Sequence, residues 1–224
     1  MQVCLQHRLG LRVAGPGDQC SSCAHHTLLD AAGHHQLTCS SGGFVTSRHN
    51  RIRDALHVLC RQAGMNPELE QGASHGDQTR PADILIPHWS LGKSAAFDLT
   101  VVSPLTDVLI QGAGELGGLD AVSAAAEKKH RENDDKCDDL GWLCVPLAVD
   151  TYGRWCDEAH KAISTVAVRL QTRTGGSISA ASCCIYNTLG VLLARHNARS
   201  ILARRSDTRI GAREVCQLGA SGRA

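Results

Sequence analysis

The chain has 224 residues, of which 42% are hydrophobic and only 3% are aromatic. This length accommodates one domain of ordinary size with a small appendage, and the shortage of aromatic residues favours helices packed on a sheet over an aromatic-rich β-sandwich. The formal net charge of +1 excludes a global field that would attract a polyanion, so any contact with nucleic acid has to come from local patches.

The cysteine content and the N-terminus indicate the compartment. There are eleven cysteines, an odd number, and twelve histidines. The N-terminus lacks the apolar core of a secretory signal, and no run approaches the roughly 20 apolar residues that cross a bilayer. We therefore expect a reducing, intracellular location, nuclear or cytoplasmic, with no membrane partner and with most thiols free. No oligomeric state is predicted.

Residues 1–45 form a segment with the ligand spacing of a zinc knuckle. A Cys-x-x-Cys pair is followed after ten residues by a histidine and after four more by a cysteine. This spacing is typical of a tetrahedral structural zinc site with three thiolates and one imidazole. His35 is an alternative fourth ligand, and His25 and His26 are further candidates. The predicted zinc ligands are Cys20, Cys23, His34 and Cys39.

An amphipathic helix is predicted over residues 48–61, ending at Gly64. Its apolar residues follow the i, i+3, i+4, i+7 spacing of one helical face, and its arginines lie mostly off that stripe. The pattern indicates one packed face and one basic face. The basic face fits a solvated surface as well as it fits a phosphate contact. This helix opens the segment 46–153, which we predict to be the main domain.

Two apolar segments that follow each carry one acid. Asp83 lies in the segment 80–86 and Asp98 lies in the segment 96–102. The connection over residues 87–93 is hairpin-like, so the two segments should be antiparallel neighbours in a sheet. An ionised carboxylate taken out of water costs several kcal/mol unless a cation meets it, so two such acids indicate a shared divalent metal. The pattern predicts a metal-dependent nuclease core.

The remainder of the chain predicts helices around one further strand. The expected order within the main domain is helix, strand, strand, helix, strand, which is an α/β arrangement. Residues 154–224 are predicted to form a C-terminal helical extension with a basic tail. The further elements are a helix at 119–130, an apolar strand at 142–149, and helical stretches at 154–173 and 179–205.

Five motifs occur along the chain in a recognisable order. They are Cys20-x-x-Cys23…His34…Cys39, Arg48-His49-Asn50, Arg80-Pro81-Ala82-Asp83, Asp98-x-Thr100-Val101, and a helix carrying Lys128 and Lys129. Over about residues 5 to 150, this succession resembles the restriction-like endonuclease region of site-specific non-LTR retrotransposons. In that family a CCHC zinc motif precedes a PD-(D/E)xK nuclease core at the C-terminal end of a reverse transcriptase polyprotein. The resemblance implies a restriction-endonuclease-like α/β fold, with a mixed sheet flanked by helices.

The resemblance also implies a catalytic site that hydrolyses phosphodiester bonds in DNA. The acids would hold Mg²⁺ or Mn²⁺, which activates a bound water and offsets charge on the scissile phosphate. In the usual core a lysine follows the second acid by two positions, but Thr100 occupies that position here. The family then supplies the lysine from the following helix. The catalytic residues implied are Glu70, Asp83, Asp98 and Lys129 or its neighbour Lys128.

The expected partners are DNA and the reverse transcriptase region of a parent polyprotein. The chain begins close to the zinc segment and has no polymerase motif, which indicates a fragment or a degraded copy of a longer element. The alternative function is a catalytically inactive, zinc-containing nucleic-acid-binding relic, favoured by Thr100 and by the near-neutral charge. The predicted nucleic-acid contacts are Arg48, His49, Arg51 and Arg80.

Overall fold

The computed structural model describes residues 2–69, 82–105 and 120–205. The chain divides into two compact units. The first unit consists of residues 1–45 and 195–224, and the second consists of residues 46–194. Residues that the sequence analysis grouped as a C-terminal extension are thus divided between the two units.

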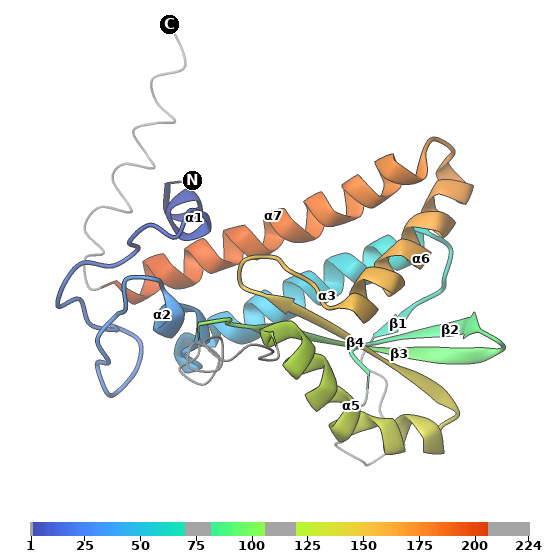
Figure 1. Cartoon of the computed structure of the whole chain (residues 1–224), viewed down its shortest axis with the longest axis horizontal. Coiled ribbons are helices and arrows are strands. Elements are labelled where there is room, and N and C mark those ends of the chain that lie inside the picture. The colour runs from blue at the N-terminus through green and yellow to red at the C-terminus, as the bar shows by residue number, and fades with distance from the viewer. Residues whose placement is uncertain (1, 70–81, 106–119, 206–224) are drawn as a thin grey trace, which may run out of the picture. The chain divides into compact units, whose positions relative to one another are not determined.

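A four-stranded mixed sheet forms the centre of the second unit (Figure 1). Its strands are β1 (Glu68–Leu69), β2 (Ile84–Ser90), β3 (Lys93–Val102) and β4 (Trp142–Asp150), in the spatial order β1-β2-β3-β4. The strand β2 is antiparallel to β1 and to β3, whereas β3 and β4 are parallel. The antiparallel pairing predicted for the two acid-bearing segments is confirmed.

The turn between β2 and β3 fixes this pairing. Ser90 pairs with Lys93, so the loop contains only Leu91 and Gly92, with φ angles of 49° and 78°. Two consecutive residues with positive φ are the signature of a type I′ turn, whose twist matches that of the flanking strands. Glycine at the second position adopts this conformation without strain.

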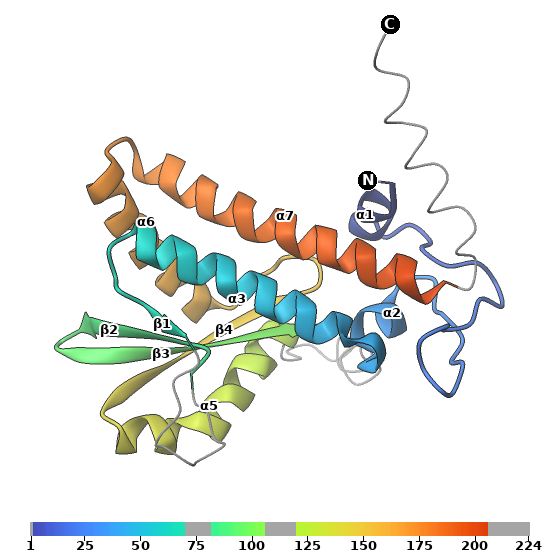
Figure 2. The same cartoon turned by 180° about the vertical axis from the view of Figure 1, so that it is seen from behind.

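Helices cover both faces of the sheet, which confirms the predicted mixed α/β class. The helices of the second unit are α3 (Phe44–Gln62), which begins two residues before it, α5 (Ala121–Asp139), α6 (Asp157–Thr174) and most of α7 (Ile178–Arg204). Helix α5 lies on one face of the sheet and α3 and α6 lie on the other (Figures 1 and 2).

The side chains of β3 alternate between these two faces. Phe97 and Leu99 are buried in the main core, which also contains Leu56 of α3 and Ile163 of α6. Ala96 instead belongs to a small buried cluster with Cys137 of α5 and Ala82. Because alternate strand residues point to opposite faces, Asp98 shares the α5 face with Ala96.

Helix α7 is the longest element and carries a buried stripe. Ala181, Ile185, Leu189 and Leu193 recur every four residues and lie in the main core. By length and composition alone, α7 is the one helix among the described residues that could cross a bilayer, which the sequence analysis did not anticipate. The helices of a protein core pass the same test, and this stripe accounts for part of the apolar character of α7.

The first unit has little regular structure and is held by side chains. Its elements are α1 (Gln2–Arg8), α2 (His34–Thr38), a 3₁₀ turn (Ser41–Gly43) and the last residues of α7. The guanidinium of Arg204, at 0% exposure, donates hydrogen bonds to the carbonyl oxygens of Cys39 (2.6 Å), Ser41 (2.9 Å) and Ser200 (3.1 Å). It also lies 4.9 Å from the centre of the Phe44 ring. Arg204 therefore ties the segment around Cys39 to α7.

Replacing Arg204 by leucine should destabilise the first unit by about 3 kcal/mol or more, because the charged donor is lost and buried carbonyls are left without it. Hydrogen exchange of residues 36–41 measures this loss directly. The matched control is Arg199→Leu, which removes an exposed arginine of the same helix and should leave the exchange rates nearly unchanged. Equal exchange in both variants would contradict the role given to Arg204.

Candidate functional site

The antiparallel pairing brings the two predicted acids side by side. Asp83 immediately precedes β2, and its backbone N–H donates to the carbonyl oxygen of Phe97 at 2.9 Å. Its Oδ2 accepts a hydrogen bond of 2.7 Å from the backbone N–H of Leu99. Asp98 is the residue between these two partners. The register, which the sequence pattern leaves open, therefore places Asp83 against the Asp98 position of β3.

A histidine of α3 binds the first acid. His49 Nε2 lies 3.1 Å from Asp83 Oδ2 and 3.0 Å from the carbonyl oxygen of Leu99. The hydrogen bond to Asp83 is the main reason why the pKa of His49 is raised. Burial alone would raise the pKa of Asp83, but the hydrogen bond and charge of His49 outweigh it and the pKa is lowered. Each group thus favours the charged form of the other.

The second acid is buried and carries an electrostatic cost. Asp98 Oδ2 accepts a hydrogen bond of 2.7 Å from Asn133 Nδ2 and lies 3.0 Å from Lys129 Nζ. Burial raises the pKa of Asp98 to about 6; Lys129 opposes this rise and the negative charge of Asp83 adds to it. A buried carboxyl with a strongly shifted pKa beside a second carboxyl is typical of a functional site.

Of the two lysines offered by the resemblance, the structure brings Lys129 to the acids. Lys128 has a side chain that is 69% exposed, and its Nζ lies 3.7 Å from Glu132 on the same helix. Consecutive helical residues point about 100° apart, so only one of the pair can face the sheet. Lys129 therefore supplies an amine where Thr100 supplies none.

One oxygen of each carboxylate accepts no hydrogen bond from the described residues. All the hydrogen bonds that Asp83 and Asp98 accept from the described part of the chain go to the Oδ2 atoms. The two Oδ1 atoms are thus the oxygens that a cation could use. Mg²⁺ and Mn²⁺ prefer carboxylate oxygen and water as ligands, so the donor atoms at this site fit such an ion.

The remaining predicted site residues are one acid and three arginines, and the structure describes only some of them. Glu70 and Arg80 lie outside the described residues. Strand β1 ends at Leu69, which pairs with Ile84 beside Asp83. Arg48 is buried, with 3% of its surface exposed, whereas Arg51 lies on the exposed side of α3.

Two contacts of the acids were missed by sequence reasoning. His49, which we predicted as a nucleic-acid contact, lies against Asp83, and Asn133, which we did not predict, lies against Asp98. Asn133 lies four residues after Lys129, and residues at that spacing share one helical face. This spacing is the signal that could have found Asn133, whereas the contact of His49 depends on how α3 packs and has no local signal.

The predicted Cys/His cluster is present in the first unit, with a different histidine. Ligand atoms of Cys20, Cys23, His35 and Cys39 all lie within 4.8 Å of one another. This arrangement could bind a metal such as zinc. His34, which we predicted as the fourth ligand, is not a member of the cluster, and the alternative His35 takes its place.

The start of α2 explains this correction. The carboxylate of Asp30 accepts hydrogen bonds from the backbone N–H groups of His34 (2.8 Å) and His35 (2.7 Å), which fixes the first turn of the helix. In this orientation His35 Nε2 lies 3.7 Å from Cys23 Sγ. His34 is turned away by the 100° step between helical neighbours.

The environment of the cluster favours thiolates at two positions. Hydrogen bonds from Thr27 are the main reason why the pKa of Cys23 is lowered to about 6. Burial acts to raise the pKa of Cys39, but Arg204 and Ser41 outweigh it and the pKa is lowered. Burial raises the pKa of Cys20. Because zinc binds the thiolate form, the lowered pKa values of Cys23 and Cys39 favour metal binding at these two positions.

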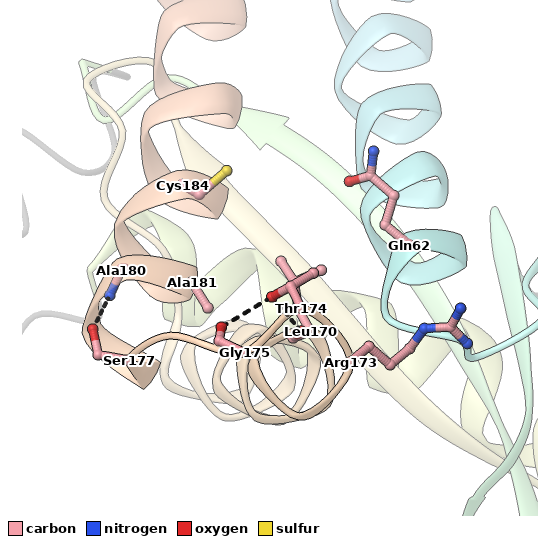
Figure 3. A pocket seen from close by; sticks show the side chains of 9 residues that line it. All are labelled: Gln62, Leu170, Arg173, Thr174, Gly175, Ser177, Ala180, Ala181 and Cys184. Carbon is pink, nitrogen blue, oxygen red and sulfur yellow. Dashed lines mark hydrogen bonds between the residues drawn. The ribbon is translucent and has the colours of Figure 1, made fainter.

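A pocket of about 680 Å³ lies elsewhere in the second unit, where α6 passes into α7 (Figure 3). Among the residues that the structure describes, Arg173 is the one charged residue lining it, and no described member of the predicted site lines it. It is lined by Gln62, Leu170, Arg173, Thr174, Gly175, Ser177, Ala180, Ala181 and Cys184.

No protein-family model matches this chain, and no curated protein matches it.

Proposed function

We propose that this protein is a metal-dependent DNA endonuclease of retrotransposon origin, with a PD-(D/E)xK core in its second unit. The observation that carries the proposal is the meeting of two acids and one amine. Asp83 lies against the Asp98 position, and Lys129 Nζ lies 3.0 Å from Asp98 Oδ2. A pair of carboxylates with a nearby amine suits hydrolysis of a phosphodiester by metal-activated water.

The order of elements supports the same proposal. Within the second unit, α3 is followed by the two-residue strand β1, by the β2–β3 hairpin, by α5 and by β4. Apart from β1, this is the helix, strand, strand, helix, strand order that the sequence pattern predicts for the main domain. The two acids come from the hairpin and the lysine comes from the next helix, as expected for the variant with Thr100 in β3.

Asp83 and Asp98 would hold Mg²⁺ or Mn²⁺, with Glu70 as the proposed third acid. The metal, when bound, lowers the pKa of a water and neutralises charge that develops on the phosphate. Lys129 orients the attacking water and stabilises the pentacovalent transition state. His49 holds Asp83 in position through a contact with its Oδ2 atom, and Asn133 holds Asp98 in the same way.

Nicking of supercoiled plasmid with Mg²⁺ or Mn²⁺ tests the proposal. We expect the native chain to nick the plasmid, and Asp98→Ala to reduce the rate by more than about 100-fold, since loss of a metal ligand should exceed the loss seen for outer-shell partners. Lys129→Ala should also be strongly impaired. Lys128→Ala is the matched control and should retain the native rate, because its side chain points to solvent.

Equal nicking by the native chain and by Asp98→Ala would refute the assignment of Asp98. A native chain that binds DNA in a salt-dependent way but does not nick it would favour the alternative, a nucleic-acid-binding relic. Arg51 on the exposed side of α3 is the described residue whose replacement should weaken such binding.

A further inference from the structure

We infer that α5 and β4 form a second metal site in the second unit, and that this site takes zinc. Its donors are His130 and Asp134 of α5 and Cys144 of β4, whose ligand atoms all lie within 4.8 Å of one another. None of these residues belongs to the cysteine cluster of the first unit, and none is one of the acids proposed to hold Mg²⁺. The donor types also differ, since a mixed nitrogen, oxygen and sulfur set suits zinc and disfavours Mg²⁺.

The fold brings these donors together from two elements. His130 and Asp134 are four residues apart on α5 and therefore share one helical face. The Nδ1 of His130 lies 2.8 Å from Asp134 Oδ1. Cys144 lies on the parallel strand β4, where it pairs with Ala96 of β3, whose side chain points to the α5 face. Helix α5 thus carries two donors to the strand that carries the third.

The far side of the histidine ring is held by a second carboxylate. His130 Nε2 lies 3.0 Å and 3.1 Å from the two carboxylate oxygens of Glu158 on α6. A carboxylate that accepts the N–H of one ring nitrogen is the usual partner of a histidine that binds metal through the other. Glu158 thereby fixes the ring so that Nδ1 faces Asp134. The orientation of the His130 ring is thus set by a residue that is not one of the three proposed donors.

Charge and access are compatible with a bound ion. Cys137 and burial raise the pKa of the Cys144 thiol, so zinc would have to displace its proton; the resulting thiolate and the carboxylate of Asp134 would balance the charge of Zn²⁺, and His130 would add a neutral donor. The side chains of His130 and Asp134 are 31% and 51% exposed, so an ion can enter from solvent. Cys137, which hydrogen-bonds to Cys144, is the nearest further thiol on α5.

Without a metal, the same contacts would be an ion-pair network. A charged His130 would lie between Asp134 and Glu158, and Cys144 would contribute only a thiol hydrogen bond to Asp134. A metal site requires the sulfur of Cys144, whereas the ion-pair network does not. Replacing Cys144 therefore distinguishes the two arrangements.

Titration of the reduced full-length chain with Co²⁺ tests the inference, because thiolate-to-cobalt charge-transfer absorption reports only sulfur-ligated ions. We expect saturation at two equivalents for the native chain, one from each cysteine-containing site. Cys144→Ser should saturate at one equivalent. The control Cys184→Ser removes an exposed thiol of α7 and should still saturate at two.

A second variant guards against misfolding in Cys144→Ser. Asp134 is an exposed helical residue, so Asp134→Asn should fold normally and should weaken the second equivalent by at least about 10-fold. Saturation of the native chain at one equivalent, or a second equivalent unaffected by Cys144→Ser and by Asp134→Asn, would overturn the inference. The titration contains neither Mg²⁺ nor DNA, so its outcome is independent of the nicking assay.

Discussion

Replacing His35 by alanine is expected to abolish zinc binding by the Cys20, Cys23, His35 and Cys39 cluster, whereas replacing His34 should leave it intact. Only the ring of His35 lies among the three sulfur atoms, and His34 is one helical step away from them. Zinc content of the purified chain measures the difference, and His34→Ala is a matched control of the same residue type in the same helix. Loss of zinc in both variants, or in neither, would contradict the assignment.

Removal of this metal should also unfold much of the first unit. Its two apolar clusters contain four buried residues each, which is too small a core to fold by itself. Structural zinc supplies roughly 10–16 kcal/mol of apparent binding free energy in zinc-finger peptides, and in such small domains it drives folding. A chelator should therefore abolish the hydrogen-exchange protection of residues 13–39.

The second unit provides the internal control for this experiment. All three tryptophans, Trp89, Trp142 and Trp155, lie in the second unit, so their fluorescence reports on it alone. We expect the fluorescence to change little in His35→Ala, which removes zinc from the first unit alone and leaves His130, Asp134 and Cys144 intact. Protection of residues 13–39 that survives chelation would show that the first unit does not depend on a metal.

The zinc ligands show how far spacing carries a prediction. The three cysteines were predicted because the knuckle and its return are short, so chain connectivity nearly fixes which sulfur atoms can meet. The histidine was not fixed in this way. His34 and His35 are adjacent, and the choice between them depends on how Asp30 caps α2 and turns its first residue. That orientation is a tertiary property with no counterpart in the spacing.

The acids show the same limit in the sheet. The apolar segments 80–86 and 96–102, joined by residues 87–93, predict a hairpin, and the structure has one with Leu91 and Gly92 at its turn. The register and the packing of α3 and α5 on opposite faces decide what each acid touches. His49 and Asn133 come from those two helices, and neither position is marked by the local pattern around Asp83 or Asp98. Local sequence therefore predicted the strands, but not the contacts of His49 and Asn133 with the acids.

Replacing Asp98 by asparagine is expected to stabilise the metal-free second unit by about 2 to 3 kcal/mol at pH 7.5. Burial raises the pKa of Asp98 from 3.8 to about 6, so the folded protein bears a cost for ionising this group that the unfolded chain does not. Asparagine keeps the shape of the neutral acid and avoids that cost. Urea unfolding followed by tryptophan fluorescence measures the difference.

The pH dependence gives the sign of this effect. Because the folded pKa lies above the unfolded value, the contribution of the protonated carboxyl is fully present below about pH 4 and is lost as the pH rises through about 6. The advantage of Asp98→Asn should therefore be large at pH 7.5 and close to zero at pH 4. Asp54→Asn, which changes a half-exposed acid paired with Arg53, is the control and should shift stability by less than about 1 kcal/mol at either pH.

Adding Mg²⁺ connects this stability to the proposed activity. A cation between Asp83 and Asp98 would stabilise the ionised form of Asp98, so Mg²⁺ should raise the stability of the native chain and not that of Asp98→Asn. The difference in free energy of unfolding between Asp98→Asn and the native chain should therefore become smaller when Mg²⁺ is added. A buried acid that serves catalysis is expected to destabilise the metal-free protein, and binding of the metal is expected to remove that destabilisation. If Asp98→Asn were less stable than the native chain at pH 7.5 without metal, Asp98 would instead be a structural partner of Lys129 and Asn133.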